Sequence, residues 1–337
     1  MDPAARLEPC CFTVVGETAR RGGPSPRATD GRSSTGATTR RGGGLQKVHC
    51  CRYPPGVFGS HLSIAGGLHH ALLDAHRLEM ETAQVFTKNQ QQWRCKPLES
   101  QTIEQWRLHA RRLKFRRTVS HDSYLINLAS PDDTLWRKSI DLFIEELRRC
   151  VALGIPYLVT HPGAHLGSGE PAGLRRVAKA LDIVHCRVAA DGVVTCLEIT
   201  AGQGTSLGHR LEHLAEIIGL VRDPARLGVC LDTAHLFAAG YDFRGRRYAG
   251  LMRQVRRTVG LSRVKVLHLN DSKKPLGSRV DRHDHIGRGL IGLEGFRPWV
   301  RDPRWDRVPK ILETPKEKAP DGRDWDAVNL ETLRGLM

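Results

Sequence analysis

Residues 227–235 read LGVCLDTAH, an apolar run that ends in a carboxylate and an imidazole. An apolar run of this length is typical of a buried β-strand, and a free thiol such as Cys230 behaves inside it as a small hydrophobe. Asp232 and His235 therefore lie at or just beyond the carboxyl end of a predicted strand. Folds built from parallel strands place their chemistry at such ends.

The same pattern recurs seven more times between Val57 and Thr314. The further strand candidates are VFGSHLSI (57–64), TAQVFT (82–87), RTVSH (117–121), YLVTH (157–161), VVTCLEIT (193–200), VKVLHLN (264–270) and PKILET (309–314). Between them lie stretches such as residues 134–154 and 171–190, whose apolar residues recur at helical spacing. Eight strands that alternate with helices predict an α/β fold, a single-domain (β/α)8 TIM barrel. An open doubly wound sheet is the alternative.

Nine side chains able to bind a metal ion follow these strands. They are His121, His161, Glu198, Asp232, His235, His268, Asp281, His283 and Glu313. A barrel brings the carboxyl ends of all its strands to one face, whereas strands at opposite edges of a flat sheet would lie too far apart to share one cluster. One tetrahedral zinc needs only about four ligands, so nine predict several ions. Imidazole and carboxylate ligands without thiolate suit Zn²⁺ or Mn²⁺.

Each of these residues also has an explanation without a metal. His161 can begin the HPG turn, Asp232 can cap the next helix, and Asp281 and His283 can belong to a solvated loop. The coincidence of all nine at equivalent places favours the metal interpretation. Seven further histidines fall in helical stretches and are expected to lie on the surface: His69, His70, His76, His109, His185, His209 and His213. His165 and His285 lie close to the ligand segments and stay undecided.

Composition separates the first 55 residues from the rest. Residues 1–55 are rich in Gly, Ser, Thr, Pro and Arg without an apolar period, which predicts a disordered basic tail, and residues 56–337 form the predicted barrel domain. The formal charge of +16 indicates a polyanionic partner. No apolar run approaches the roughly 20 residues that cross a bilayer, so no membrane partner is expected. Nine cysteines without a C-x-x-C pair indicate a reducing cytosol.

Nine segments in order resemble the signature segments of the endonuclease IV family of DNA-repair enzymes. They are GSHLSIAGG (59–67), FTKNQQQW (86–93), HDSYLINL (121–128), HPGAH (161–165), LEITAGQG (197–204), DTAHLFAAGYD (232–242), HLNDSK (268–273), GSRVDRHDHIGRG (277–289) and ILET (311–314). The resemblance runs from about Val57 into the last helical stretch and leaves only the tail uncovered.

The resemblance implies a barrel with three zinc ions, with Mn²⁺ as an alternative at one site. It gives the first zinc to His121, His161 and Glu198, the second to Glu198, Asp232, His268 and Glu313, and the third to His235, Asp281 and His283. The implied reaction is hydrolysis on the 5′ side of abasic sites in double-stranded DNA during base excision repair, leaving a 3′-hydroxyl and a 5′-deoxyribose phosphate. Glu198 and Glu313 are the expected catalytic residues.

The resemblance also implies which side chains meet DNA. Gln91, Tyr124 and Leu125 are expected to reach into the duplex, and His61 and Asn270 to line the pocket. Better-known relatives carry a basic residue where this chain has Gln91. A cytoplasmic monomer is expected, associated with the nucleoid if the source is bacterial. A metal-dependent sugar isomerase with a related barrel and a non-catalytic DNA-binding barrel are the competing functions.

Overall fold

The computed structural model describes residues 56–190 and 192–337, and the predicted basic tail lies outside the described residues. Eight parallel strands form one sheet in the order β1-β10-β7-β6-β5-β4-β3-β2. They are β1 (Val57–Ser60), β2 (Gln84–Val85), β3 (Val119–His121), β4 (Tyr157–Thr160), β5 (Val194–Glu198), β6 (Leu227–Asp232), β7 (Val264–His268) and β10 (Pro309–Leu312).

The sheet closes into a ring at its first two strands. A parallel bridge joins His61 to Gln84, directly after β1 and at the start of β2. The strands approach closely here, because a Cβ on Gly59 would lie 2.2 Å from the carbonyl oxygen of Thr82. Only glycine fits this contact. The ring confirms the predicted TIM barrel and excludes the open doubly wound sheet.

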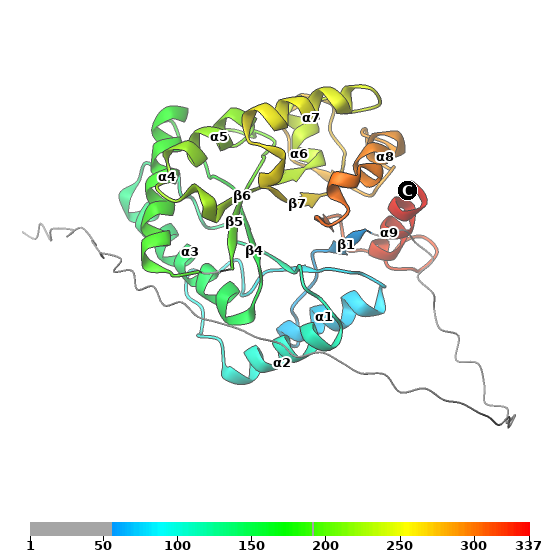
Figure 1. Ribbon diagram of the computed structural model, residues 1–337, viewed down its shortest axis with the longest axis horizontal. Helices are drawn as coiled ribbons and strands as arrows, with labels where there is room; N and C mark the ends of the chain where they lie inside the picture. Colours follow the sequence, from blue (N-terminus) through cyan, green and yellow to red (C-terminus); the bar gives the residue numbers. More distant parts are fainter. Residues whose placement is uncertain (1–55, 191) are drawn as a thin grey trace, which may run out of the picture. The chain divides into compact units, whose positions relative to one another are not determined.

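Helices surround the ring (Figure 1). They are α1 (Leu68–Arg77), α2 (Ser100–Arg112), α3 (Asp133–Leu153), α4 (Glu170–Arg187), α5 (Leu211–Leu220), α6 (Thr233–Ala239), α7 (Arg247–Thr258), α8 (Leu293–Arg301) and α9 (Trp325–Gly335). Short 3-10 turns precede three of the strands, at η1 (Pro224–Arg226), η2 (Leu261–Arg263) and η3 (Pro303–Trp305). Among the described residues, no helix is long and apolar enough to cross a membrane.

The apolar side chains divide into two groups, as expected for strands buried on both faces. The larger cluster lies between the strands and the helices. A smaller one fills the ring, and consists of Val119, Val159, Cys196, Cys230, Val266 and Ile311. Cys196 and Cys230 are fully buried free thiols, in agreement with the sequence analysis. The ring is therefore packed below the face on which the strands end.

One element was not anticipated from the sequence. After β7 the chain forms a small antiparallel pair, β8 (Asp271–Ser272) with β9 (His283–Asp284). The long connection between these two strands carries Asp281, and β9 itself carries His283. This hairpin folds a distant part of one loop over the carboxyl ends of the strands.

Candidate metal centre

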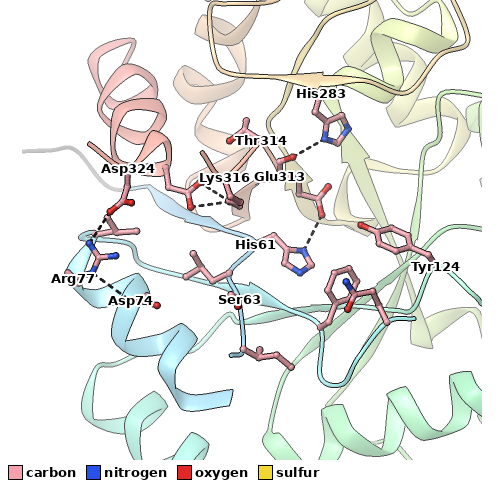
Figure 2. Close-up of a pocket in the computed structure, with 16 residues that line it drawn as sticks. His61, Ser63, Asp74, Arg77, Tyr124, His283, Glu313, Thr314, Lys316 and Asp324 are labelled. Atoms are coloured by element: carbon pink, nitrogen blue, oxygen red, sulfur yellow. Dashed lines mark hydrogen bonds and ion pairs between the residues drawn. The ribbon is translucent and has the colours of Figure 1, made fainter. Parts of the chain in front are cut away.

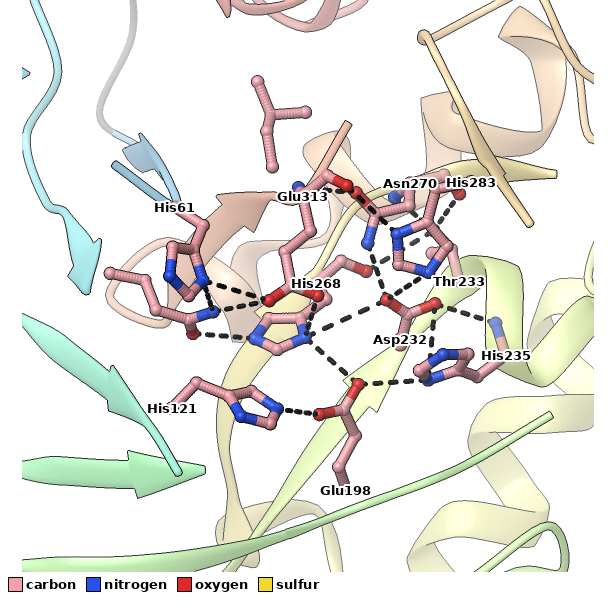
Figure 3. A network of polar contacts seen from close by, with 12 residues as sticks. His61, His121, Glu198, Asp232, Thr233, His235, His268, Asn270, His283 and Glu313 are labelled. Carbon is pink, nitrogen blue, oxygen red and sulfur yellow. Dashed lines mark hydrogen bonds and ion pairs between the residues drawn. The ribbon is translucent and has the colours of Figure 1, made fainter. Parts of the chain in front are cut away.

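Glu198, the last residue of β5, lies at the centre of a group of histidines (Figure 3). Its Oε2 is 3.2 Å from Nε2 of His121 and 3.3 Å from Nε2 of His161. Its Oε1 is 3.0 Å from Nδ1 of His235 and 3.1 Å from Nδ1 of His268. The carboxylate is fully buried, so four imidazoles replace the water that would otherwise solvate its charge.

Two further carboxylates complete a group around His268. Its Nδ1 lies 3.0 Å from Oε2 of Glu313 and 3.9 Å from Oδ2 of Asp232. Potential ligand atoms of Glu198, Asp232, His268 and Glu313 all lie within 4.8 Å of one another, as do those of His121, His161 and Glu198. These two groups have the same members as the first two sets that the family resemblance implies.

The third group differs slightly from the expected set. Asp281 contacts Nε2 of His235 at 3.1 Å and Nε2 of His283 at 3.2 Å. The atoms that lie mutually within 4.8 Å, however, belong to Asp232, His235 and His283. Asp232 thus faces two groups at once, and Asp281 approaches the third from its solvent side with a 40% exposed side chain.

The histidine rings are oriented by partners outside the cluster. His121 donates from Nδ1 to the backbone carbonyl of Asp122 at 2.9 Å, and His283 from Nδ1 to that of Glu313 at 3.1 Å. Both rings therefore turn an unprotonated Nε2 toward the carboxylates when neutral, as a metal ligand must. Nε2 of His283 is buried and makes no hydrogen bond in the described structure, although Asp281 and Asp232 lie 3.2 and 3.8 Å away. A buried nitrogen that faces two carboxylates in this way fits a metal ligand.

The charge balance of the cluster also favours cations. Burial alone would lower the pKa of His121, but the hydrogen bond and charge of Glu198 raise it to about 9. Burial acts likewise on His283, whose pKa the charges of Asp232 and Asp281 raise to about 9. Burial would raise the pKa of Glu198, yet His268 and His161 hold it well below its usual range. In the metal-free protein, protons on imidazoles supply the positive charge that four carboxylates require.

A pocket of about 560 Å³ opens beside the cluster (Figure 2). His61, Phe86, Tyr124, His283 and Glu313 are among the residues that line it. Tyr124 projects at the rim with 72% of its surface exposed, and its ring packs edge-on against Phe86 at 5.4 Å. His61 lies on the pocket wall, where its Nδ1 is 3.5 Å from Oε1 of Glu313.

The other residues expected to meet DNA lie in different settings. Gln91 is exposed on the loop after β2, whereas Leu125 is half-buried and packs against the main core. Asn270 is fully buried beneath the cluster rather than on the pocket wall. Its side chain donates to Oδ2 of Asp232 at 2.6 Å and accepts from the backbone N–H of Glu313 at 2.7 Å. The structure therefore places Asn270 as a support for two carboxylates.

Sequence reasoning missed Gln84, a buried residue of β2. Nε2 of His268 donates to Oε1 of Gln84 at 2.9 Å. The side-chain N–H of Gln84 donates in turn to Oε1 of Glu313 at 2.6 Å. The signal was present, because an amide inside the apolar run TAQVF requires a buried partner. Asp232 caps α6, since its Oδ1 accepts from the N–H of His235 at 2.7 Å, and its carboxylate also faces the cluster.

Comparisons with known proteins agree with this geometry. A family model described as a xylose isomerase-like TIM barrel matches residues 72–334. A protein of Chloroflexus aurantiacus named probable endonuclease 4 is 50% identical over an alignment of 287 residues, and the match covers 83% of this chain and 98% of that relative. The chain belongs to the endonuclease IV family. It is accordingly an enzyme of the nuclease class.

Solved structures extend the comparison. The crystal structure of endonuclease IV from Thermus thermophilus has a TM-score of 0.73 and 37% sequence identity, covering 84% of this chain and 98% of that one. A D-tagatose 3-epimerase-like protein has a TM-score of 0.63 at 19% identity, over 83% of this chain and 96% of that one. The second likeness shows a shared barrel fold alone. The endonuclease IV family thus shares its architecture with sugar-converting enzymes.

This member of the endonuclease IV family has another His and Glu cluster, where α4 meets the loop before α5. His209 and His213 are only 7% and 1% exposed, so the prediction that they lie on the surface was wrong. Nε2 of His213 lies 3.2 Å from Glu170, and its Nδ1 accepts from the N–H of Gly208 at 3.2 Å. Arg210 also donates from its Nε to Nε2 of His213 at 3.0 Å. Arg210, 2.8 Å from Glu170, supplies the positive charge. We assign this cluster as an ion-pair network.

Proposed function

We propose that the chain is a DNA-repair endonuclease that hydrolyses the phosphodiester bond on the 5′ side of an abasic site, leaving a 3′-hydroxyl and a 5′-deoxyribose phosphate, in base excision repair. One observation carries the proposal. Imidazoles and carboxylates converge around Glu198 on the open face of a barrel that is 50% identical to a probable endonuclease 4.

Three zinc ions are the proposed cofactors, with Mn²⁺ as an alternative at one site. The first would be held by His121, His161 and Glu198, the second by Glu198, Asp232, His268 and Glu313, and the third by His235, Asp281 and His283 with Asp232 beside them. When bound, the ions would acidify water near neutral pH and offset the charge of the phosphate. Nε2 of His283, which is buried without a hydrogen bond, and the four carboxylates gathered in the cluster support this assignment.

Glu198 and Glu313 are the proposed catalytic carboxylates, with different tasks. Glu198 is fully buried among four imidazoles, where a substrate cannot reach it. Its proposed task is therefore to contribute to two of the metal sites. The side chain of Glu313 is 17% exposed and borders the pocket, where His61 and Gln84 hold one of its oxygens. Glu313 is therefore the better-placed group to accept a proton from water in the pocket.

The proposed substrate is double-stranded DNA that contains an abasic site. A nucleotide without a base loses its stacking and pairing, so it rotates out of the helix at little cost and can enter a pocket beside the cluster. Tyr124 at the rim is the candidate to fill the vacated space, with Gln91 and Leu125 on the neighbouring loops. A monomer in the cytoplasm is part of the same proposal.

The test is incision of a duplex that carries one tetrahydrofuran abasic analogue, with an undamaged duplex as control. The analogue lacks an aldehyde and therefore blocks lyase chemistry. We expect cutting on the 5′ side with a 3′-hydroxyl end, loss of cutting after prolonged chelation, and recovery with zinc. Glu198→Gln should be inactive. Intact duplex in the presence of metal-loaded protein would refute the proposal and favour a sugar isomerase.

A further inference from the structure

The loop that follows β2 forms one rim of the pocket. We call residues 87–96 the rim loop. Gln90 lines the pocket together with Tyr124, and Asn89 and residues 91–94 are exposed to solvent. A polymer that delivers a phosphate to the metal centre must pass this edge. The position of the rim loop therefore bears directly on substrate binding.

The rim loop itself contains no helix or strand, and a buried arginine on α3 links its two ends. Arg149 donates to the carbonyl of Thr87 at 2.6 Å and to the carbonyl of Lys96 at 3.0 Å. The side chain of Arg149 is only 8% exposed. One guanidinium thus fixes the distance between the start and the end of the loop.

Two further side chains hold the middle of the rim loop. Nζ of Lys88 donates to the carbonyls of Asn89 at 3.4 Å and Gln92 at 3.5 Å. Oγ of Ser123, next to Tyr124 in the loop after β3, donates to the carbonyl of Gln90 at 2.6 Å. Backbone carbonyls of the loop that lack a ladder partner are therefore satisfied by side chains, as buried or constrained polar groups require.

Lys88 is paired with Glu146 of α3, whereas Arg149 is paired with Glu145 at 3.5 Å. Oε1 of Glu146 lies 3.3 Å from Nζ of Lys88, and both side chains are 2% exposed. Its Oε2 accepts from the hydroxyl of Thr87 at 2.8 Å. Burial raises the pKa of Glu146, and the charges of Lys88 and Arg149 oppose that rise. Without this carboxylate, the buried ammonium group of Lys88 would lose its ion-pair partner, which is unfavourable.

We propose that Glu146 is a positioning residue that holds the rim loop in its DNA-binding conformation through Lys88 and Thr87, and so sets the affinity for damaged DNA without touching it. The inference rests on the proposed function. If the charge of Glu146 is removed, Lys88 should turn toward solvent and no longer bind the carbonyls of Asn89 and Gln92. The rim loop would then become ordered only when DNA binds, and the entropy lost at that step would weaken binding. The metal centre would be unaffected.

The experiment compares Glu146→Gln, the double variant Lys88→Met/Glu146→Gln, and the control Glu216→Gln, which makes the same change on the exposed face of α5. Glutamine keeps the size of Glu146 and an acceptor for Thr87. The double variant removes the buried charges together, so it should recover stability if Glu146→Gln is unstable, yet it still lacks the ammonium that holds the loop. Steady-state incision of the tetrahydrofuran duplex, zinc content and hydrolysis of bis(p-nitrophenyl) phosphate are measured on each protein.

We expect KM for the duplex to rise about tenfold in both loop variants, an amount comparable to ordering one or two side chains on binding. The turnover number, the zinc content and hydrolysis of the small phosphodiester should stay within about twofold of wild type. The control should match wild type in every readout. A double variant that folds and keeps the wild-type KM overturns the inference, as does a parallel loss of zinc and small-substrate hydrolysis. Wild-type protein that fails to cut the duplex at all overturns the proposed function as well.

Discussion

Replacing Asn270 by alanine should weaken zinc binding, although Asn270 belongs to none of the three ligand groups. The side chain is fully buried, donates to Asp232 at 2.6 Å and accepts from the N–H of Glu313 at 2.7 Å. Loss of a hydrogen bond to a charged group costs about 1.5–3 kcal/mol and loss of a neutral one about 0.5–1.5 kcal/mol, so the metal-free variant should lose about 2–4 kcal/mol of unfolding free energy. Loss of a residue that orients a ligand weakens metal binding by about 10- to 100-fold.

The matched control is Tyr248→Phe. The Tyr248 hydroxyl also donates to a buried carboxylate, Asp302, at 2.8 Å and accepts from an N–H, that of Trp305, at 2.8 Å. The phenylalanine variant should therefore lose a similar unfolding free energy while it keeps its zinc. Urea denaturation of the metal-free proteins measures the first quantity, and competition with a chromophoric chelator measures the second. Zinc affinity of Asn270→Ala within twofold of wild type, or an equal loss in Tyr248→Phe, would refute the reasoning.

Zinc binding at pH 7 should release at least two protons, because His121 and His283 have a pKa of about 9 in the metal-free protein and must lose their protons to bind. The pKa values of the other two buried ligands, His235 and His268, are also raised well above their usual value. Titration calorimetry in buffers of different ionisation enthalpy counts the released protons, and buffer-independent heats would contradict this. The same shifts stabilise the metal-free protein fully below pH 6.5, and this contribution of a few kcal/mol is lost as the pH rises through 9, which urea denaturation across that window checks. Tyr124→Ala should weaken abasic-duplex binding about tenfold and leave the unfolding free energy within about 0.5 kcal/mol, measured by fluorescence anisotropy and by urea; unchanged affinity would assign Tyr124 to packing. Asp271→Ala removes acceptors for the N–H groups of Gly287 and Ile291, both at 2.9 Å, and should cost about 3–6 kcal/mol of unfolding free energy by urea denaturation. A loss below 1 kcal/mol would mean that water replaces them.

The barrel and most of the candidate centre could be predicted because their signals are local. An apolar run that ends in His, Asp or Glu predicts a strand and also the face of the barrel on which its last side chain lies. Glu198 illustrates this, since the run VVTCLEIT places it at the end of β5 without any knowledge of its neighbours. The eight observed strands lie within the predicted stretches and are mostly shorter, because pairing ends where the strands diverge toward the loops.

The supporting residues could not be predicted, because their roles depend on partners far away in the sequence. Asn270 joins Asp232 to Glu313, and Glu146 holds a loop that lies about 60 residues earlier in the chain. Neither role can be inferred from the apolar periodicity of a strand, which is two residues, or of a helix, which is three or four. Such residues are visible only once the ring has brought their partners together.

The arrangement of the centre implies that the stability of the fold and the binding of metal are coupled. Burial of the Glu198 carboxylate is costly unless positive charge lies beside it, and among the described residues of the metal-free protein protonated imidazoles provide that charge. Metal ions that replace those protons would relieve the cost over a wider pH range, so the folded barrel and the loaded centre should reinforce each other. The polar residues outside the cluster, Gln84 and Asn270 among them, then contribute both to stability and to metal binding. They hold the carboxylates apart in a fixed geometry before any metal binds, and this lowers the ordering cost of binding.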